Sequence, residues 1–87
     1  MDPASFRGRP LSLGRLLAGV FPELGRPLRG DDSPETLASW DSVRHAEIVL
    51  SVEEAYGLEL TTREIRDLRS VAALAEILRR RGKDVAI

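Results

Sequence analysis

Residues 40–57 read WDSVRHAEIVLSVEEAYG, and this stretch decides the fold. Asp41 is a preferred residue type for the N-cap of a helix. Gly57 is well placed to end the same helix, because glycine adopts the left-handed conformation that follows many helix C-termini. The sequence therefore predicts one helix from about Ser42 to about Tyr56.

Apolar side chains cover most of this predicted helix. The exception is one narrow polar stripe, made of Arg44, Glu47, Ser51 and Glu54. A helix that is apolar over so much of its circumference contacts several neighbours at once, so we expect it at the centre of the fold. Val49 and Leu50 would then belong to the core, and truncating either one to alanine would cost roughly 1–4 kcal/mol.

The segments before this helix have a different character. From Leu11 onward, apolar residues recur at helical spacing until Pro22, which ends that helix or forces a final turn. Residues 22–41 form a long connection rich in proline, glycine and aspartate. Such connections usually hold a short element of their own, and we expect a single helical turn over residues 34–38.

Capping signals mark the segments after the central helix. Thr61 and Glu64 form a capping-box pattern for a short helix over residues 62–67. Ser70 is the expected cap of a last helix over about residues 71–81, and Gly82 would end it. The prediction is an all-α bundle of three main helices plus a short third helix, with a long loop between the first and second helices and essentially no strands.

The expected domain organisation is simple, because 87 residues suffice for one small domain. Residues 1–10 are predicted as a loose N-terminal segment, residues 11–82 as the domain and residues 83–87 as a C-terminal tail.

Composition excludes several classes of protein. The chain has no cysteine, so disulfides, thiolate zinc sites and cysteine nucleophiles are excluded. Its single histidine, His45, is too little for a histidine-based metal cluster. No apolar run approaches the length needed to cross a bilayer, and we expect a cytoplasmic protein.

Charge is distributed unevenly along the chain. Residues 1–30 carry a net charge of +3, residues 31–67 carry −7, and residues 68–87 carry +3. An acidic middle between basic ends favours a partner whose surface presents basic groups to that middle.

Several motifs together resemble the acyl and peptidyl carrier protein family. In that family an Asp-Ser-Leu motif starts the second helix, and an ending of the type Glu-Glu-x-Phe/Tyr-Gly closes it. Here the start is Trp40-Asp41-Ser42-Val43, and the ending is Glu53-Glu54-Ala55-Tyr56-Gly57. The segments 62–65 and 70–74 are similar to the third helix and the start of the fourth helix of the family. The resemblance covers about residues 11–81.

The resemblance implies an acyl-carrier-protein-like bundle without catalytic activity of its own. It implies that Ser42 carries a 4′-phosphopantetheine arm, taken from coenzyme A by a phosphopantetheinyl transferase, and that Asp41 is the motif residue that caps the helix. Acyl groups would be held on the arm as thioesters. Other enzymes of a biosynthetic pathway, of the polyketide or fatty acid kind, would load and accept these groups.

Two residues depart from the usual pattern of the family. Trp40 stands where glycine is usual, and Val43 replaces the usual leucine. A tryptophan before Asp-Ser favours a discrete carrier of specialised metabolism. Trp40 either covers the loop against the core, which is the interpretation we favour, or lines the path of the cargo near the arm.

We expect partner enzymes to recognise the polar stripe of the central helix. Glu47 and Glu54 would pair with basic residues of the partner, with Val43 and Arg44 beside them. Exposed ion pairs contribute only about 0.2–1 kcal/mol each, so these contacts would orient the partner more than hold it.

The same residues also allow plainer interpretations. Ser42 could do no more than help Asp41 to cap a helix, because that position selects such residues. His45 lies one turn from Ser42, but nothing in the sequence pairs it with an orienting acid. We therefore interpret His45 as a partly exposed surface histidine.

Other functions remain open at this stage. A peptidyl or aminoacyl carrier is one alternative, and an unmodified helical interaction module with the carrier fold is another. A DNA-binding protein is disfavoured because the candidate recognition helices carry acidic residues. We expect a monomer that binds neither nucleic acid nor membrane.

Overall fold

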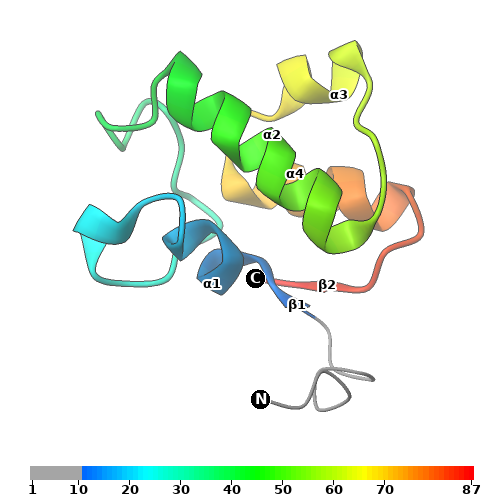
Figure 1. The fold of residues 1–87 in the computed structure, drawn as a ribbon, viewed down its shortest axis with the longest axis horizontal. Coiled ribbons are helices and arrows are strands. Elements are labelled where there is room, and N and C mark those ends of the chain that lie inside the picture. The colour runs from blue at the N-terminus through cyan, green and yellow to red at the C-terminus, as the bar shows by residue number, and fades with distance from the viewer. Residues whose placement is uncertain (1–10) are drawn as a thin grey trace.

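The computed structural model describes residues 11–87, and the segment predicted to be loose, residues 1–10, lies outside this range. The described chain is mostly helical, as the predicted all-α class requires (Figure 1). The helices are α1 (Leu13–Ala18), α2 (Ser42–Tyr56), α3 (Thr62–Asp67) and α4 (Val71–Arg80), with a short 3₁₀ turn at Pro22–Leu24. Helix α1 packs against both α2 and α4, and α3 packs against α4.

The longest helix, α2, begins and ends where its capping residues indicate. The side chain of Asp41 accepts a hydrogen bond from the backbone N–H of Arg44, and Gly57 adopts the left-handed conformation, with φ 66°, just past the end. The capping box of α3 is also present, with Thr61 and Glu64 each bonded to the other's backbone. These boundaries confirm the local capping predictions.

The first predicted main helix is much shorter than expected. Helix α1 has only 6 residues, the same length as α3, and it ends at Ala18 with Gly19 as its C-cap. Val20 and Phe21 follow outside the helix but are still buried, at 8% and 0% exposed. The apolar spacing therefore predicted correctly which residues enter the core, but not how far the helix continues.

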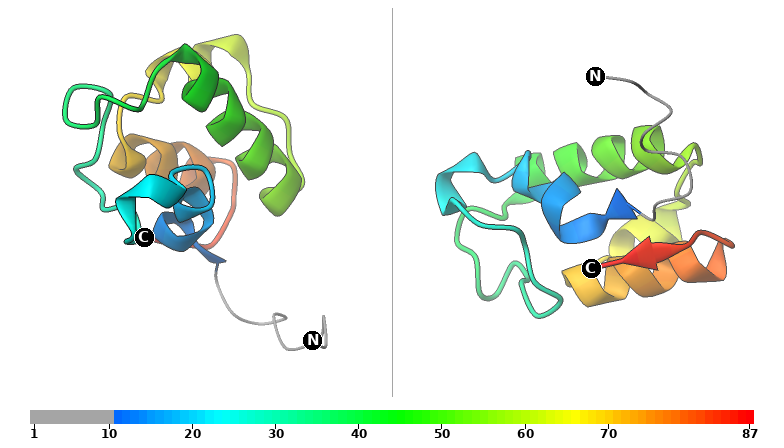
Figure 2. Two further views of the ribbon diagram at one scale, coloured as in Figure 1. Left: turned by 60° about the vertical axis from the view of Figure 1, so that its left-hand side comes forward. Right: turned by 90° about the horizontal axis from the view of Figure 1, so that it is seen from below.

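The core lies between α1, α2 and α4, which Figure 2 shows from two further directions. Its largest fully buried side chains are Phe21, Leu13, Leu17, Ile48, Leu68, Leu74, Leu78, Val52 and Val71. Residues from every helix except α3 enter this set, and Ile65 of α3 is partly buried against it. Among the four α-helices of residues 11–87, α3 is thus the one least fixed by apolar burial.

The C-terminal residues belong to the fold, which corrects the prediction of a tail at residues 83–87. Strand β2 (Val85–Ala86) pairs in parallel with strand β1 (Leu11–Ser12). Val85 is 6% exposed, and the Ser12 hydroxyl donates to the carbonyl of Ile87 at 3.0 Å. The chain returns to the domain because Gly82, with φ 79°, reverses its direction after α4. The apolar Val85 then gains burial, which a free tail would forgo.

The long loop between α1 and α2 is anchored on the start of α4. The N–H groups of Val71 and Ala72 donate to the carbonyls of Asp32 and Gly30 at 3.1 and 2.9 Å. The first N–H groups of a helix have no partner within it, so the loop supplies partners that the helix lacks. Residues 34–36 form a turn, and the N–H of Leu37 donates to the carbonyl of Ser33 at 2.8 Å, so the single turn predicted over 34–38 is present in a shorter form.

Asp32 holds this loop in shape. Its side chain, 9% exposed, accepts two hydrogen bonds from the Arg26 guanidinium, at 2.8 and 3.0 Å, and one from the N–H of Arg29 at 2.7 Å. The hydrogen bonds from Arg26 are the main reason that the pKa of Asp32 lies below its ordinary value, and burial opposes this effect. The loop therefore depends on the ionised form of Asp32.

We expect Asp32 to make folding sensitive to acid. Because its pKa is lower in the folded chain, its stabilisation is present above the unfolded-state pKa of about 4 and is lost as the pH falls through the folded-state pKa. The free energy of unfolding should therefore decrease less between about pH 5 and about pH 3 in Asp32→Asn than in the wild type. Urea unfolding at a series of pH values measures this. Parallel pH curves for the two proteins would contradict the assignment.

Candidate functional site

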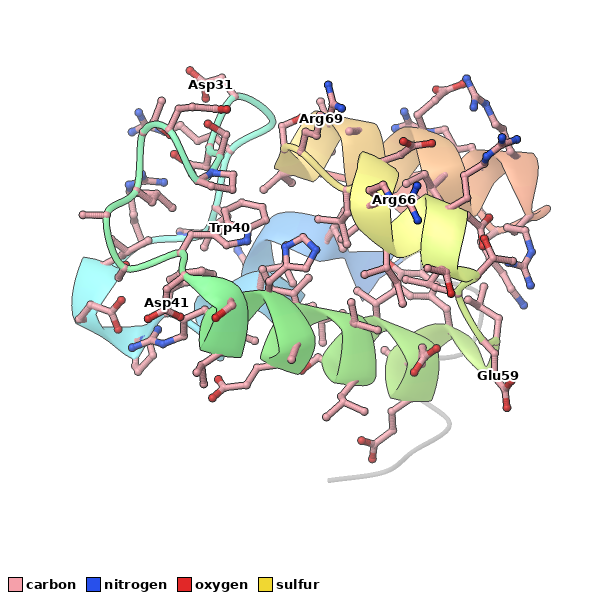
Figure 3. All side chains as sticks on the ribbon, turned by 90° about the horizontal axis from the view of Figure 1, so that it is seen from above. Asp31, Trp40, Asp41, Glu59, Arg66 and Arg69 are labelled. Atoms are coloured by element: carbon pink, nitrogen blue, oxygen red, sulfur yellow. The ribbon has the colours of Figure 1, made fainter. Side chains whose placement is uncertain are left out.

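Ser42 is the first residue of α2, and its side chain is exposed. Asp41 caps the helix through its own carboxylate, at 2.9 Å from the N–H of Arg44, so the cap does not use the Ser42 hydroxyl. Among residues 11–87 this hydroxyl has no hydrogen-bond partner. Figure 3 shows Asp41 at the start of α2, beside Trp40 at the end of the loop. The hydroxyl of Ser42 is thus held at a fixed point and is accessible to another molecule.

Two hollows open on either side of Ser42. The first, of about 240 Å³, lies against the loop and is lined by Pro34, Trp40, Asp41, Ser42 and His45. The second, of about 340 Å³, lies between α2 and α3 and is lined by Ser42, His45, Ala46, Val49, Leu50 and Ile65. The lining of the second hollow is mostly apolar, so the surface beside the Ser42 hydroxyl can receive an apolar group.

Trp40 lies where the favoured interpretation puts it. It is 4% exposed, and its ring centroid is 5.9 Å from that of Phe21. It covers the end of the loop against the core, while one side of it still lines the hollow on the loop side. A glycine at this position would leave that part of the core uncovered.

Three of the four predicted recognition residues are free at the surface of α2. Val43 is 64% exposed, and Glu47 and Glu54 are exposed as well. Glu53, one residue before Glu54, is engaged within the chain, because its carboxylate accepts a hydrogen bond from the N–H of Leu60 at 2.8 Å. Glu53 therefore holds the segment after α2.

Arg44 is the exception among the predicted recognition residues. Its guanidinium donates to the carbonyl of Val20 and to the carboxylate of Glu23, and it lies 5.2 Å from the centre of the Phe21 ring. The side chain ties α2 to the end of the α1 segment and is not free to meet a partner. The prediction placed Arg44 on an open stripe because the sequence shows none of these three distant partners.

Leu50 was assigned wrongly to the core. It is 65% exposed, whereas Ile48 is 0% and Val49 8% exposed. Helix α2 is covered on one side only, and its open side carries an apolar ridge formed by Val43, Ala46 and Leu50. The sequence pattern indicates how many apolar residues surround the helix, but it does not reveal which of them another helix covers.

His45 is the site residue whose role the sequence did not reveal. The indole N–H of Trp40 donates to its Nδ1 at 3.1 Å, and its Nε2 lies 3.0 Å from the carbonyl oxygen of Ile65 in α3. A surface histidine would leave both nitrogens to water. The spacing of Trp40 and His45 offered one signal, because residues five apart can meet across a helix start, but the carbonyl of Ile65 lies 20 residues away in the chain.

The site combines an exposed hydroxyl with two hollows that open beside it. Within the described part of the chain, no group of three histidine, cysteine, aspartate or glutamate side chains is placed to hold a metal ion. Within the same residues, every helix is too short or too polar to cross a lipid bilayer. What the geometry does present is one exposed hydroxyl, the two hollows beside it and an acidic helix below it.

Comparison of this chain with family models, with curated proteins and with solved structures found no match.

Neighbouring residues of α2 provide a test of its exposed ridge. Ile48→Ala removes a fully buried side chain and should lower the free energy of unfolding by about 2–5 kcal/mol. Leu50→Ala removes a side chain of the same size from the surface and should change it by no more than about 0.5 kcal/mol. Urea unfolding of both variants gives the two values. A loss at Leu50 as large as that at Ile48 would show that the ridge is covered.

Proposed function

We propose that this protein is an acyl carrier protein, in which Ser42 is the attachment point of a 4′-phosphopantetheine arm. The observation that supports this most is the free hydroxyl of Ser42 at the first position of a 15-residue helix whose cap is supplied by its neighbour Asp41. The side-chain oxygen of a serine that served only as a cap would accept a hydrogen bond from a backbone N–H, as that of Ser70 does at α4. The arrangement of helices and the long anchored loop are compatible with the carrier bundle.

The attachment step needs little from this chain beyond presentation. The Ser42 oxygen would attack the β-phosphorus of coenzyme A, forming the phosphodiester and releasing adenosine 3′,5′-bisphosphate, and the transferase would supply Mg²⁺ and a base to accept the hydroxyl proton. The start of α2 favours the resulting negative charge, because unpaired N–H groups and the helix dipole point toward it. Asp41 contributes the cap that keeps this helix start in place.

When attached, the arm supplies a terminal thiol that holds acyl groups as thioesters. The apolar hollow between α2 and α3 begins at Ser42, so an apolar cargo can rest on the surface beside its attachment point. Glu47 and Glu54 offer carboxylates to basic residues of a partner, and Val43 adds an apolar contact. Individually weak contacts of this kind suit a carrier that visits several enzymes in turn.

An interaction module without the arm is the second candidate. The exposed ridge of Val43, Ala46 and Leu50 favours it, because contiguous apolar residues on a surface often mark a contact with another protein. An aminoacyl or peptidyl cargo instead of an acyl cargo is also compatible with Ser42. The discrete, monomeric carrier of a specialised biosynthetic pathway, working in the cytoplasm, remains our prediction from the resemblance.

Intact-mass measurement tests the proposal directly. The chain, incubated with coenzyme A, Mg²⁺ and a broad-specificity phosphopantetheinyl transferase, should gain the mass of one phosphopantetheinyl group. Ser42→Ala should gain none, while Ser51→Ala, a matched serine in the same helix, should be modified like the wild type. An unmodified wild-type chain that is folded by circular dichroism would exclude the carrier function and leave the interaction module.

A further inference from the structure

His45 joins three parts of the chain that meet beside Ser42. Trp40 ends the loop, His45 lies in the first turn of α2, and Ile65 lies in α3. The Trp40 indole N–H donates to Nδ1 of His45 at 3.1 Å, and Nε2 lies 3.0 Å from the carbonyl oxygen of Ile65. Among residues 11–87, the second contact is the only hydrogen bond between α2 and α3. The histidine ring therefore connects the loop to α3 through α2.

The two partners of the ring fix its protonation state. An indole N–H can only donate a hydrogen bond, and a carbonyl oxygen can only accept one. Nδ1 must therefore be the bare nitrogen, and Nε2 must carry the proton. A protonated ring would present an N–H at Nδ1 to the N–H of Trp40, so only the neutral ring can make both hydrogen bonds.

The ring also forms a wall of the candidate site. His45 lines both the hollow on the loop side and the hollow between α2 and α3. Trp40 is buried against Phe21, and its ring centroid lies 6.3 Å from that of His45. Helix α3 contributes no fully buried side chain to the core, and the hydrogen bond from His45 joins it directly to α2.

We propose that His45 is a positioning residue that, while its ring is neutral, holds Trp40 and α3 in place around Ser42, and that protonation of the ring releases Trp40. The neutral ring supplies two hydrogen bonds and the protonated ring loses the one to Trp40, so this contact is present at higher pH and is lost as the pH falls. Because the inference concerns the unmodified chain, it stands or falls separately from the attachment of an arm to Ser42.

Charged groups around the ring come from each element that packs against it. Asp41 lines the same hollow from the loop side. On α2 itself, the Arg44 side chain is directed to Val20 and Glu23. On α3, Arg66 and Asp67 follow Ile65 and are exposed, and Arg66 is labelled in Figure 3. Charges of both signs therefore lie on these three elements, and the hydrogen bond to Trp40 is the contact that depends on the protonation of the ring.

The chain suits a direct test by nuclear magnetic resonance, because it contains one histidine and one tryptophan. In the ¹⁵N-labelled full chain at about pH 8, long-range ¹H–¹⁵N spectra should show the neutral ring with its proton on Nε2. As the pH is lowered, the indole N–H resonance of Trp40 and the backbone amides of α3 should shift together with the His45 ring resonances. A proton on Nδ1 at high pH would overturn the proposal. So would an indole N–H chemical shift that stays constant while the resonances of the His45 ring change with pH.

Two variants distinguish the loss of the two His45 hydrogen bonds from a general loss of structure. His45→Ala should increase the exchange rate of the indole N–H about two- to tenfold at high pH, the effect expected from one net hydrogen bond. In His45→Gln the amide can accept from Trp40 and donate to Ile65 but cannot titrate in this range. The pH-dependent shift of the indole resonance should therefore disappear in His45→Gln. A shift that persists in this variant would assign the transition to another group and overturn the proposal.

Discussion

The hydrogen bond from the Arg44 N–H to the Asp41 carboxylate is the constraint on which the site depends. It fixes the residue at which α2 begins, and it meets the need of the helix start for a capping group without using Ser42. If Ser42 supplied the cap, its hydroxyl would turn back toward the helix and be unavailable. The two adjacent residues therefore have separate roles, because Asp41 caps the helix and the hydroxyl of Ser42 remains accessible.

This start of α2 is held in turn by contacts that surround it on three sides. Arg44 ties it to Val20 and Glu23 at the end of the α1 segment, and Trp40 packs on Phe21 just before it. The loop that leads to it is anchored farther back, where Asp32 and Gly30 accept the first N–H groups of α4. A flexible connection of this length would leave Ser42 at no fixed position, so the anchors convert a loop into part of the scaffold.

The sequence predicted those features that neighbouring residues determine among themselves. The bounds of α2 and α3, the Asp41 cap and the left-handed Gly57 all follow from residues within one or two turns, and the structure confirms them. Arg44 and Leu50 were interpreted wrongly for the opposite reason, and His45 is partly exposed as predicted but makes two hydrogen bonds that the sequence did not indicate. The partners of Arg44 and of His45 Nε2 lie 20 or more residues away, and the exposure of Leu50 depends on where α3 comes to rest. The pairing of Val85 with Leu11 joins the two ends of the described chain and has no local signal.

Helix α2 has one buried side and one exposed side, and apolar side chains lie on both. Ile48 and Val52 face inward and are fully buried, while Val43 and Leu50 face outward on the same helix. Burying an apolar side chain of this kind would stabilise the fold by roughly 1.5–3 kcal/mol, and each one left in water does not contribute this free energy. A chain of 87 residues has little stability to lose, and the proposed carrier function would use this uncovered ridge beside the accessible serine as a contact surface for partner enzymes. The fold is therefore held from the inner side of α2, while the outer side of the helix remains open to solvent.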